Sequence, residues 1–352
     1  MRRRTYRPRR RYYRRKARWP GVMAGSALLC LLVVCLSFFH VWDLVIAPQP
    51  VQANALAAGF QQPSQARGLV HRSMPSSPEL SEITERLLAL LDRQYQDSVT
   101  AQGIAILNED GQTLYEKDAD TPRSPASMTK LMTAIVMLDS GCLEDTVTVG
   151  DLYSCYVDGS VLLYLEEGEE ISMRDLLAAL MIESANDAAA AIAIHVAGSI
   201  EDFADLMNKK AEEMGLTNTH FVNPHGLTAE GHYTTPRDMA QIVRKASEYE
   251  ILRELTTISS YDCTSISPSG DIKEYSFESG NGFVLGSNEA NHFKYICGKT
   301  GYTSAAGLCL AAAFESETGE NYYCVVMKSE SHFADMSRTM NYFGERLEVA
   351  AD

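Results

Sequence analysis

Apolar residues recur at two different spacings along the chain, and the change of spacing divides it into zones. Between residues 131 and 260 they mostly recur every three or four positions, which predicts helices. On both sides of this zone apolar and polar residues alternate, which predicts strands, and Asp110-Gly111 marks the turn of an N-terminal hairpin. The strands are expected at 102–107, 113–117, 306–315 and 321–327. Strands at both ends of the sequence predict one sheet assembled from both, beside a helical lobe.

Polar residues mark several helix starts in a recurring pattern. A serine or threonine followed three positions later by an aspartate resembles a capping box, because the hydroxyl accepts an N–H that the first turn leaves unpaired. The pattern occurs at Ser172–Asp175, Ser199–Asp202 and Thr235–Asp238, the last with Pro236 at the first helical position. A final helix is expected over 336–349, and an amphipathic helix after Pro78 with an apolar stripe of Leu80, Ile83, Leu87, Leu90 and Leu91.

Charge separates the first 20 residues from the rest. They hold 11 lysines and arginines and no acid, which leaves 20 basic against 46 acidic residues, a formal charge of −26, for the remainder. Residues 21–39 carry no charge and the apolar character persists to 47, which is long enough for a membrane span with the basic arm on the cytoplasmic side. A cleaved signal peptide fits equally, with small residues for cleavage at 51–55. Both alternatives export the rest of the chain, and neither gives the arm a nucleic-acid partner.

These observations divide the 352 residues into four parts. We expect a basic cytoplasmic arm at 1–20, a transmembrane anchor or signal segment at 21–47, a linker at 48–78 and a folded domain at 79–352. The linker is rich in proline, glutamine, alanine and serine and lacks a clear period. With 45% hydrophobic residues in the chain, the domain can bury a substantial core.

One segment combines a nucleophile with a candidate base. In Ser124-Pro125-Ala126-Ser127-Met128-Thr129-Lys130, which opens an apolar helical run, Ser127 and Lys130 lie three positions apart and share one face of a helix. A serine hydroxyl needs a base to take its proton, and a lysine serves only if burial or neighbouring charge lowers its pKa. The helix N-terminus adds partial positive charge beside Ser127, which favours an oxyanion. Alone, the pair is equally typical of a polar helix start with a solvated lysine.

Two further polar motifs strengthen the catalytic interpretation. In Glu183-Ser184-Ala185-Asn186-Asp187, between two helical runs, Ser184 and Asn186 can point into one cleft, although a helix–helix turn capped by Asn186 or Asp187 has the same pattern. Lys299-Thr300-Gly301 lies in an alternating stretch that predicts a strand, where Gly301 would let a substrate backbone approach closely. A lysine and a threonine beside such a gap suit a carboxylate.

The three motifs, S-x-x-K, S-x-N and K-T-G in this order, resemble those of the penicillin-binding proteins and class A β-lactamases. The surrounding residues are similar to the D-alanyl-D-alanine carboxypeptidases among the low-molecular-mass penicillin-binding proteins, peptidase family S11. This similarity extends from about Gln102 to the C-terminus. It is carried by 125–134, 166–169, 221–227, 232–235, 238–240, 299–303 and Ala306-Gly307.

The resemblance implies a fold and a location. The fold class is α/β (α+β) and β-lactamase/transpeptidase-like, an antiparallel sheet flanked by helices plus a helical lobe, with an N-terminal membrane segment. The location is the bacterial cell envelope, outside the cytoplasmic membrane, with the domain N-terminally anchored or secreted. Many relatives carry an extra C-terminal β-domain and a terminal amphipathic anchor. Since Asp352 is the last residue here, we expect any tether to be the N-terminal one.

The resemblance also implies an activity, a serine-type D-Ala-D-Ala carboxypeptidase acting on peptidoglycan stem peptides. Ser127 would attack the terminal peptide bond and form an acyl-enzyme, releasing D-alanine. Lys130 would remove the serine proton, and Ser184 would help return a proton to the leaving amine. Asn186 would hold the substrate amide. β-Lactams are expected to inhibit by acylating Ser127.

The remaining implied roles concern substrate binding. Lys299 and Thr300, beside Gly301, would bind the terminal carboxylate. The backbone N–H groups of Ser127 and Tyr302 would form the oxyanion hole. No metal and no cofactor is implied.

A second S-x-N competes with the first. Ser279-Gly280-Asn281 is a literal S-G-N, whereas position 185 holds alanine where the family usually has glycine. Spacing favours Ser184, because the family places this motif between two helices and far before K-T-G, and Ser279 lies only 20 residues before Lys299. Ala185 raises a question about the backbone of the loop, since glycine tolerates positive φ and alanine does not.

Cysteines and histidines could form disulfides or a catalytic pair, or they could simply pack in the interior. Cys297, Cys309 and Cys324 fall in predicted strands of the exported part, where disulfides are possible but buried free thiols are expected. His225 and His232 could suggest a serine–histidine pair. Because Lys130 is better placed to be the base, we interpret both as loop-packing residues.

Two alternative functions stay open. A β-lactamase needs a carboxylate that drives deacylation, and Glu166 and Glu167 are candidates, although they match the carboxypeptidase pattern around Glu-Gly-Glu. A membrane-tethered penicillin or peptidoglycan sensor, which acylates and barely turns over, would carry the same motifs.

Overall fold

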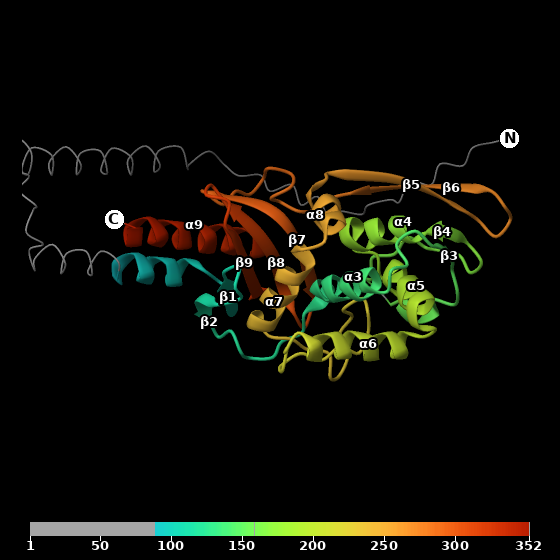
Figure 1. The fold of residues 1–352 in the computed structure, drawn as a ribbon, viewed down its shortest axis with the longest axis horizontal. Coiled ribbons are helices and arrows are strands. Elements are labelled where there is room, and N and C mark those ends of the chain that lie inside the picture. Colours follow the sequence, from blue (N-terminus) through green and yellow to red (C-terminus); the bar gives the residue numbers. More distant parts are fainter. Residues whose placement is uncertain (1–88, 158, 352) are drawn as a thin grey trace, which may run out of the picture. The chain divides into compact units, whose positions relative to one another are not determined.

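The computed structural model describes residues 89–157 and 159–351. A five-stranded antiparallel sheet with strand order β2-β1-β9-β8-β7 organises them, with helices on both faces (Figure 1). The expected basic arm, membrane or signal segment and linker lie outside the described residues. No helix of the described residues is long and apolar enough to cross a membrane.

The main sheet joins the two ends of the described chain, as the alternating pattern predicts. Its strands are β1 (Gly103–Leu107), β2 (Thr113–Lys117), β7 (Phe293–Thr303), β8 (Gly307–Ser316) and β9 (Asn321–Ser329). Strand β1 pairs with β9 from Gly103 opposite Met327 to Leu107 opposite Tyr323. This pairing confirms the prediction of one sheet built from both ends, and it leaves β7 at the edge.

Each face of the sheet has its own hydrophobic core, because successive side chains of a strand point to opposite faces. Ile104 and Ile106 pack toward α9 (His332–Ala351), whereas Ala105 and Leu107 pack toward the helical lobe. The helix at 89–98 lies beside α9 (Figure 1), where the rings of Tyr95 and Tyr342 stack at 4.2 Å.

One expectation about the helix at 89–98 was wrong. Leu90 and Leu91 belong to its predicted apolar stripe, but both are exposed. Tyr95 and Val99 are the buried residues of this segment. The aromatic side chain of Tyr95 offers more apolar area than a leucine and a stacking partner on α9, so the helix buries that side instead.

The helical lobe contains α3 (Thr129–Asp139), α4 (Met173–Ala178), α5 (Asn186–Ala197), α6 (Ile200–Glu213), α7 (Pro236–Ser247) and α8 (Glu250–Thr257). The three predicted caps are confirmed, since the hydroxyls of Ser172, Ser199 and Thr235 accept the N–H of the aspartate three positions later, at 3.0, 3.0 and 3.1 Å. Helix α7 packs against β1 and β9 and so connects lobe and sheet.

A second, four-stranded sheet of order β3-β4-β5-β6 covers the far side of the lobe (Figure 1). Its strands are β3 (Thr146–Thr148), β4 (Glu170–Ser172), β5 (Ser260–Ile266) and β6 (Ile272–Glu278). Strands β5 and β6 fall in the zone after residue 260, where alternation predicts strands. Strands β3 and β4 have three residues each, which is too short to show alternation, so their pairing into this sheet was not predicted.

The cysteines of the main sheet follow the expectation for buried free thiols. Cys297, Cys309 and Cys324 lie on β7, β8 and β9, and all three are buried and free. Burial raises the pKa of Cys297 to about 12 and that of Cys309 to about 11. They therefore stay protonated and act as small apolar residues.

Candidate active site

Ser127 lies in a tight turn that precedes the most buried helix of the lobe. The turn is a 3-10 helix over Ala126–Met128, and Ala126 adopts a left-handed backbone with φ 48°. Helix α3 follows at once, and its residues from Thr129 to Met137 are all buried. Ser127 is half-buried, whereas Lys130, one turn further into the protein, is completely buried.

The Nζ atom of Lys130 has three oxygen partners. It lies 3.0 Å from Oγ of Ser127, 2.7 Å from Oδ1 of Asn186 and 2.7 Å from the backbone carbonyl of His225. The two latter groups only accept hydrogen bonds. A neutral amine has two N–H groups and one lone pair, so when these acceptors take both N–H groups the lone pair faces the hydroxyl of Ser127.

The protonation state of Lys130 follows from its surroundings. Burial, and then the nearby positive charge of Lys299, hold the pKa of Lys130 well below its usual range. The neutral amine is the form that can accept a proton from Ser127. The structure therefore brings together a serine and a lysine whose environment suits a general base.

The S-x-N motif lies where a π-helical turn meets α5. The turn covers Ala179–Glu183, and Ser184 ends it in the left-handed conformation with φ 68°. Ala185 has an ordinary extended backbone with φ −65°, so the alanine in place of glycine causes no strain. The left-handed position is the serine itself. Asn186, the first residue of α5, is buried and contacts Lys130.

The K-T-G motif lies on the edge strand β7, at the point where it packs against the turn of Ser127. A side chain at Gly301 would come within 2.9 Å of the Pro125 carbonyl and 3.1 Å of the Met128 nitrogen, so only glycine allows this approach. Thr300 is half-buried and precedes this contact, and Tyr302, which follows it, is exposed.

Lys299 is buried beside these residues. Its Nζ atom donates to the carbonyl of Thr300 at 3.3 Å. Burial lowers the pKa of Lys299 to about 8, although the negative charge of Glu183 opposes that shift. Lys299 thus remains largely protonated at neutral pH, and its positive charge disfavours protonation of Lys130.

Sequence reasoning missed the part played by the loop at 221–227. The carbonyl of His225 accepts from Lys130, and the carbonyl of Pro224 accepts from the hydroxyl of Thr133 at 2.6 Å. Gly226 has φ 86°, and a side chain there would overlap the carbonyl oxygen of Ala126. The segment stood out only through its family resemblance, because a backbone carbonyl leaves no signal in residue types.

The two histidines pack the loop, in agreement with their interpretation. Nδ1 of His232 accepts the N–H of Val222 at 3.0 Å, and its Nε2 lies 2.9 Å from the hydroxyl of Thr129. Burial lowers the pKa of His225 to about 3 and that of His232 to about 4, so both are neutral. Their rings serve the loop, and Lys130 is the basic group in contact with Ser127.

The competing S-G-N motif folds into a turn of its own. Oγ of Ser279 accepts the N–H of Asn281 at 3.2 Å, and Oδ1 of Asn281 accepts the N–H of Phe283 at 3.0 Å. This turn follows β6, in the second sheet. Asn186, in contrast, contacts Lys130 at 2.7 Å, and Ser184 lies two residues before it in the chain.

Of the two acidic candidates for deacylation, Glu166 is held toward the second sheet and Glu167 is exposed. Glu166 pairs with Lys273 on β6 at 3.3 Å. Glu169 is completely buried and binds the same lysine at 2.6 Å, together with the hydroxyls of Ser265 and Tyr275. This network fastens the 166–169 turn to the hairpin of β5 and β6.

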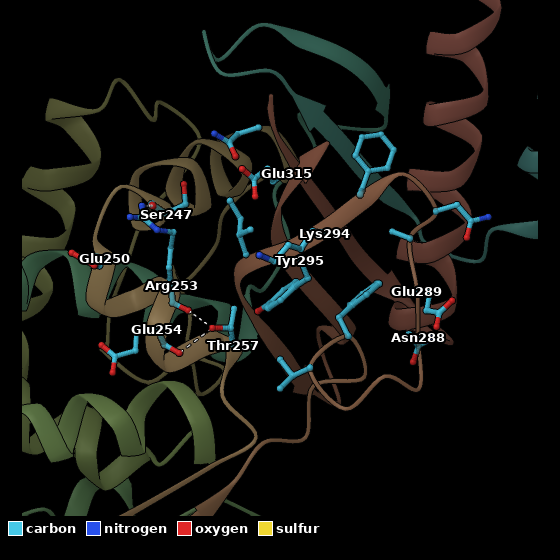
Figure 2. A pocket seen from close by; sticks show the side chains of 17 residues that line it. Ser247, Glu250, Arg253, Glu254, Thr257, Asn288, Glu289, Lys294, Tyr295 and Glu315 are labelled. Carbon is cyan, nitrogen blue, oxygen red and sulfur yellow. Dashed lines mark hydrogen bonds between the residues drawn. The ribbon is translucent and has the colours of Figure 1, made fainter. Parts of the chain in front are cut away.

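A separate hollow of about 1060 Å³ lies between α8 and the first half of β7 (Figure 2). Its wall includes Ser247, whose hydroxyl donates to the carbonyl of Arg244 at 2.7 Å, together with charged side chains such as Arg253 and Lys294. It contains none of the three motifs. Nor does the described part of the chain hold a cluster of three potential metal-ligating side chains.

Comparisons with known proteins show the family of this chain. The family model of D-alanyl-D-alanine carboxypeptidases, peptidase S11, matches residues 92–331. The D-alanyl-D-alanine carboxypeptidase DacF of Bacillus subtilis is 35% identical over 60% of this chain and 52% of its own length. The D-alanyl-D-alanine carboxypeptidase of Streptomyces sp. strain K15 is 32% identical over 68% of this chain and 85% of its own.

Solved structures show the same fold. The crystal structure of the Streptomyces K15 DD-transpeptidase superimposes with a TM-score of 0.63 at 32% identity, over 69% of this chain and 97% of that one. The match to DacF spans only about half the length of that relative. The family model nevertheless covers well over half of this chain, and the α+β fold with antiparallel sheets agrees. The chain belongs to the D-alanyl-D-alanine carboxypeptidase family, peptidase S11.

Proposed function

We propose that the protein is a serine-type D-Ala-D-Ala carboxypeptidase that removes the terminal D-alanine from peptidoglycan stem peptides. The observation that carries this proposal is the 3.0 Å contact between Nζ of Lys130 and Oγ of Ser127, made by a lysine whose other two partners are acceptors. Burial lowers the pKa of this lysine, and in its neutral form the amine can take the hydroxyl proton.

The reaction begins with acylation of Ser127. Lys130 removes the proton from the hydroxyl while Oγ attacks the carbonyl carbon between the two D-alanine residues. The backbone N–H groups of Ser127 and Tyr302 stabilise the oxyanion of the tetrahedral intermediate. As that intermediate collapses, the C–N bond breaks, and the proton that Lys130 took passes through the Ser184 hydroxyl to the leaving amine, which returns Lys130 to its neutral form. Free D-alanine departs and an ester on Ser127 remains.

Substrate binding uses the residues around this pair. The terminal carboxylate binds the ammonium of Lys299 and the hydroxyl of Thr300, and Gly301 lets the peptide backbone lie against β7. Asn186 holds an amide on the acyl side. Water then attacks the ester carbonyl with Lys130 as the base, which releases the shortened peptide and restores the Ser127 hydroxyl. These steps need no metal and no cofactor.

β-Lactams would enter the same pathway as inhibitors. Their strained amide takes the place of the terminal peptide bond, Ser127 opens the ring, and the acyl product lingers. The expected setting is the bacterial cell envelope, with residues 21–47 as a membrane anchor or cleaved signal and the catalytic domain outside the cytoplasmic membrane.

The neighbour named as a DD-transpeptidase suggests a second outcome for the ester. An amine from another stem peptide could replace water and give a cross-link, with the same Ser127 chemistry. A β-lactamase is less well supported, because the candidate Glu166 is engaged with Lys273. A sensor would stop at the ester.

One experiment tests the proposal and separates these outcomes. The purified full chain is incubated with benzylpenicillin, or with a pentapeptide ending in D-Ala-D-Ala, with and without an acceptor amine, and followed by mass spectrometry. We expect one penicilloyl group on the peptide that contains Ser127, and many equivalents of free D-alanine per enzyme. An adduct on another serine, or acylation without release of D-alanine, would contradict the carboxypeptidase proposal.

A further inference from the structure

A tyrosine near the S-x-N motif has an unusual backbone. Tyr164 is in the left-handed region with φ 60°, and its side chain is 55% exposed. The left-handed backbone is unfavourable for any residue with a Cβ, so a tyrosine keeps it only where neighbouring groups hold the backbone in place. Of the described non-glycine residues that share this conformation, Ala126 and Ser184 belong to the candidate active site.

The enforcing group is the carboxylate of Asp187. It accepts the N–H of Leu163 at 3.0 Å and the N–H of Leu165 at 3.3 Å, the two residues on either side of Tyr164. Asp187 is completely buried in the first turn of α5 and also accepts the N–H of Ala188. One buried carboxylate thus accepts hydrogen bonds from the backbone directly before and directly after the strained residue.

The carbonyl side of the same segment is also fixed. The hydroxyl of Tyr156 donates to the carbonyl of Leu165 at 3.0 Å, and Nζ of Lys273 approaches the carbonyl of Tyr164 at 3.5 Å. The backbone around Tyr164 is therefore held from both directions, while its ring makes the exposed surface.

The segment is also joined to the catalytic constellation. The backbone N–H of Asn186 donates to the carbonyl of Val161 at 2.8 Å. Asn186 uses its side chain to contact Lys130. Adjacent residues of one helix start, Asn186 and Asp187, thus connect the 161–165 segment to the base of Ser127.

We propose that Asp187 is a positioning residue that holds Tyr164 in its strained conformation, so that the exposed ring contacts the stem peptide upstream of its D-Ala-D-Ala end. The inference rests on the proposed function. Lys299 and Thr300 account for the terminal carboxylate there, and Asn186 for an amide on the acyl side. The 161–165 segment is bonded to the backbone of Asn186, whose side chain contacts Lys130, so the inference places beside it the part of the peptide that extends away from the cleaved bond. Tyr164 would then set the preference for a long stem peptide over a minimal dipeptide.

The test compares two substrates, a stem pentapeptide and N-acetyl-D-Ala-D-Ala, on variants that separate ring from backbone. Tyr164→Gly removes the ring and suits positive φ, so it should raise Tm and lower kcat/KM for the pentapeptide about tenfold, mainly through KM. The dipeptide should be nearly unaffected. Tyr164→Phe should behave like the wild type on both. Tyr153→Ala, at an exposed tyrosine with no left-handed backbone, is the matched control and should change neither substrate.

The role of Asp187 is tested by epistasis. Asp187→Asn offers one acceptor oxygen and an NH₂ group that faces the other N–H, so it should lower Tm and reduce the preference for the pentapeptide. The double variant with Tyr164→Gly should have a higher Tm than Asp187→Asn alone, because glycine adopts positive φ without the hydrogen bonds of Asp187. The preference for the pentapeptide over the dipeptide should stay lost, because the ring is absent. Asp202→Asn, which removes an exposed first-turn carboxylate from α6, controls for the helix-end charge. If Asp187→Asn does not fold, the Tyr164 series decides alone.

Two results would overturn the inference while leaving the proposed function intact. One is an equal loss on both substrates in Tyr164→Gly, and the other is no loss on either. If the wild type released D-alanine from neither substrate, the proposed function itself would fail, and this inference with it.

Discussion

The backbone carbonyl of His225 accepts a hydrogen bond of 2.7 Å from Nζ of Lys130, 95 positions earlier in the chain. A carbonyl has no side chain to select, so the loop as a whole must be held against α3. The backbone of Gly226 packs directly against the carbonyl of Ala126, which keeps the loop close to the start of α3. Oδ1 of Asn223 accepts the N–H of Gly226 at 2.7 Å and so fixes the loop in this conformation. The position of Lys130, the proposed base, therefore depends on a glycine that does not contact it through a side chain.

Replacing Gly226 by alanine should damage both stability and acylation. The new Cβ would overlap backbone atoms of Ala126, and φ 86° is unfavourable for any residue with a side chain. We expect the free energy of unfolding to fall by about 3 kcal/mol or more, measured by urea denaturation. Gly198→Ala is the matched control, since it has φ 88° but open space around it, and should cost only about 1 kcal/mol. Equal losses in the two variants would contradict the packing argument.

The activity should decline at alkaline pH because of Lys299. Its pKa is lowered to about 8, so the ammonium that is proposed to bind the substrate carboxylate is present below that pH and lost above it. The kcat/KM for a peptide with a free carboxylate should therefore fall above about pH 8, by up to tenfold per pH unit. Initial rates between pH 6 and 10 measure this. A profile that stays flat through pH 10 would exclude Lys299 as the carboxylate ligand.

Lys299→Gln should weaken recognition of the free carboxylate. A charge-assisted hydrogen bond contributes about 1.5–3 kcal/mol, so kcat/KM should fall roughly 10²-fold. A peptide with an amidated C-terminus should be a poor substrate of the wild type and lose little more in the variant. If Lys299 only supported the strand, both peptides would lose rate equally and thermal stability would fall as well.

The same variant should also change the acid side of the pH profile. The charge of Lys299 helps to lower the pKa of Lys130, and Lys130 must be neutral to act as a base. Removing that charge should raise the pKa of Lys130 and move the acid limb of kcat/KM to higher pH. Because penicillin acylation needs the same base, its rate against pH should show the same displacement. An acid limb that moves to lower pH would contradict the assignment of Lys130.

Ser184→Ala should lower the acylation rate by orders of magnitude, since Ser184 passes the proton to the leaving group in the proposed mechanism. Ser279→Ala should change it little, because Ser279 belongs to a separate turn after β6. Stopped-flow acylation with a chromogenic β-lactam measures both. Similar effects in the two variants, or a larger one at Ser279, would show that the literal S-G-N is the functional motif.

The sequence allows prediction where a few neighbouring residues decide the structure. The hydroxyl caps at Ser172, Ser199 and Thr235 depend on groups three positions away, and they were found where the pattern predicts. The three motifs depend on fixed spacing in the same way. At the S-x-N loop the sequence indicates that some residue must bend the chain, but not that Ser184, rather than position 185, takes the left-handed conformation.

Features that depend on distant backbone were not predictable. The contact of Lys130 with the His225 carbonyl joins helix and loop through an atom that every residue possesses. The second sheet joins β4 to β5 through Glu170 and Ile266, which lie far apart in the sequence. The exposed Leu90 is a third example. Which of two apolar sides a helix buries depends on the element that packs against it, and here the ring of Tyr342 stacks on Tyr95.

The pairing of β1 with β9 has a consequence for the order of events during synthesis. The hairpin of β1 and β2 and the Ser127 segment leave the ribosome first, whereas β7, with Lys299, and β9 follow only after the whole helical lobe. Until then one edge of β1 stays open, and open edges pair readily with strands of other chains. Ser127 can thus acquire the surroundings described here only after β7 and β9 have been made. If Ser127 is the nucleophile, a penicillin label on it would accordingly count chains that include β7 and β9 and ignore shorter nascent ones.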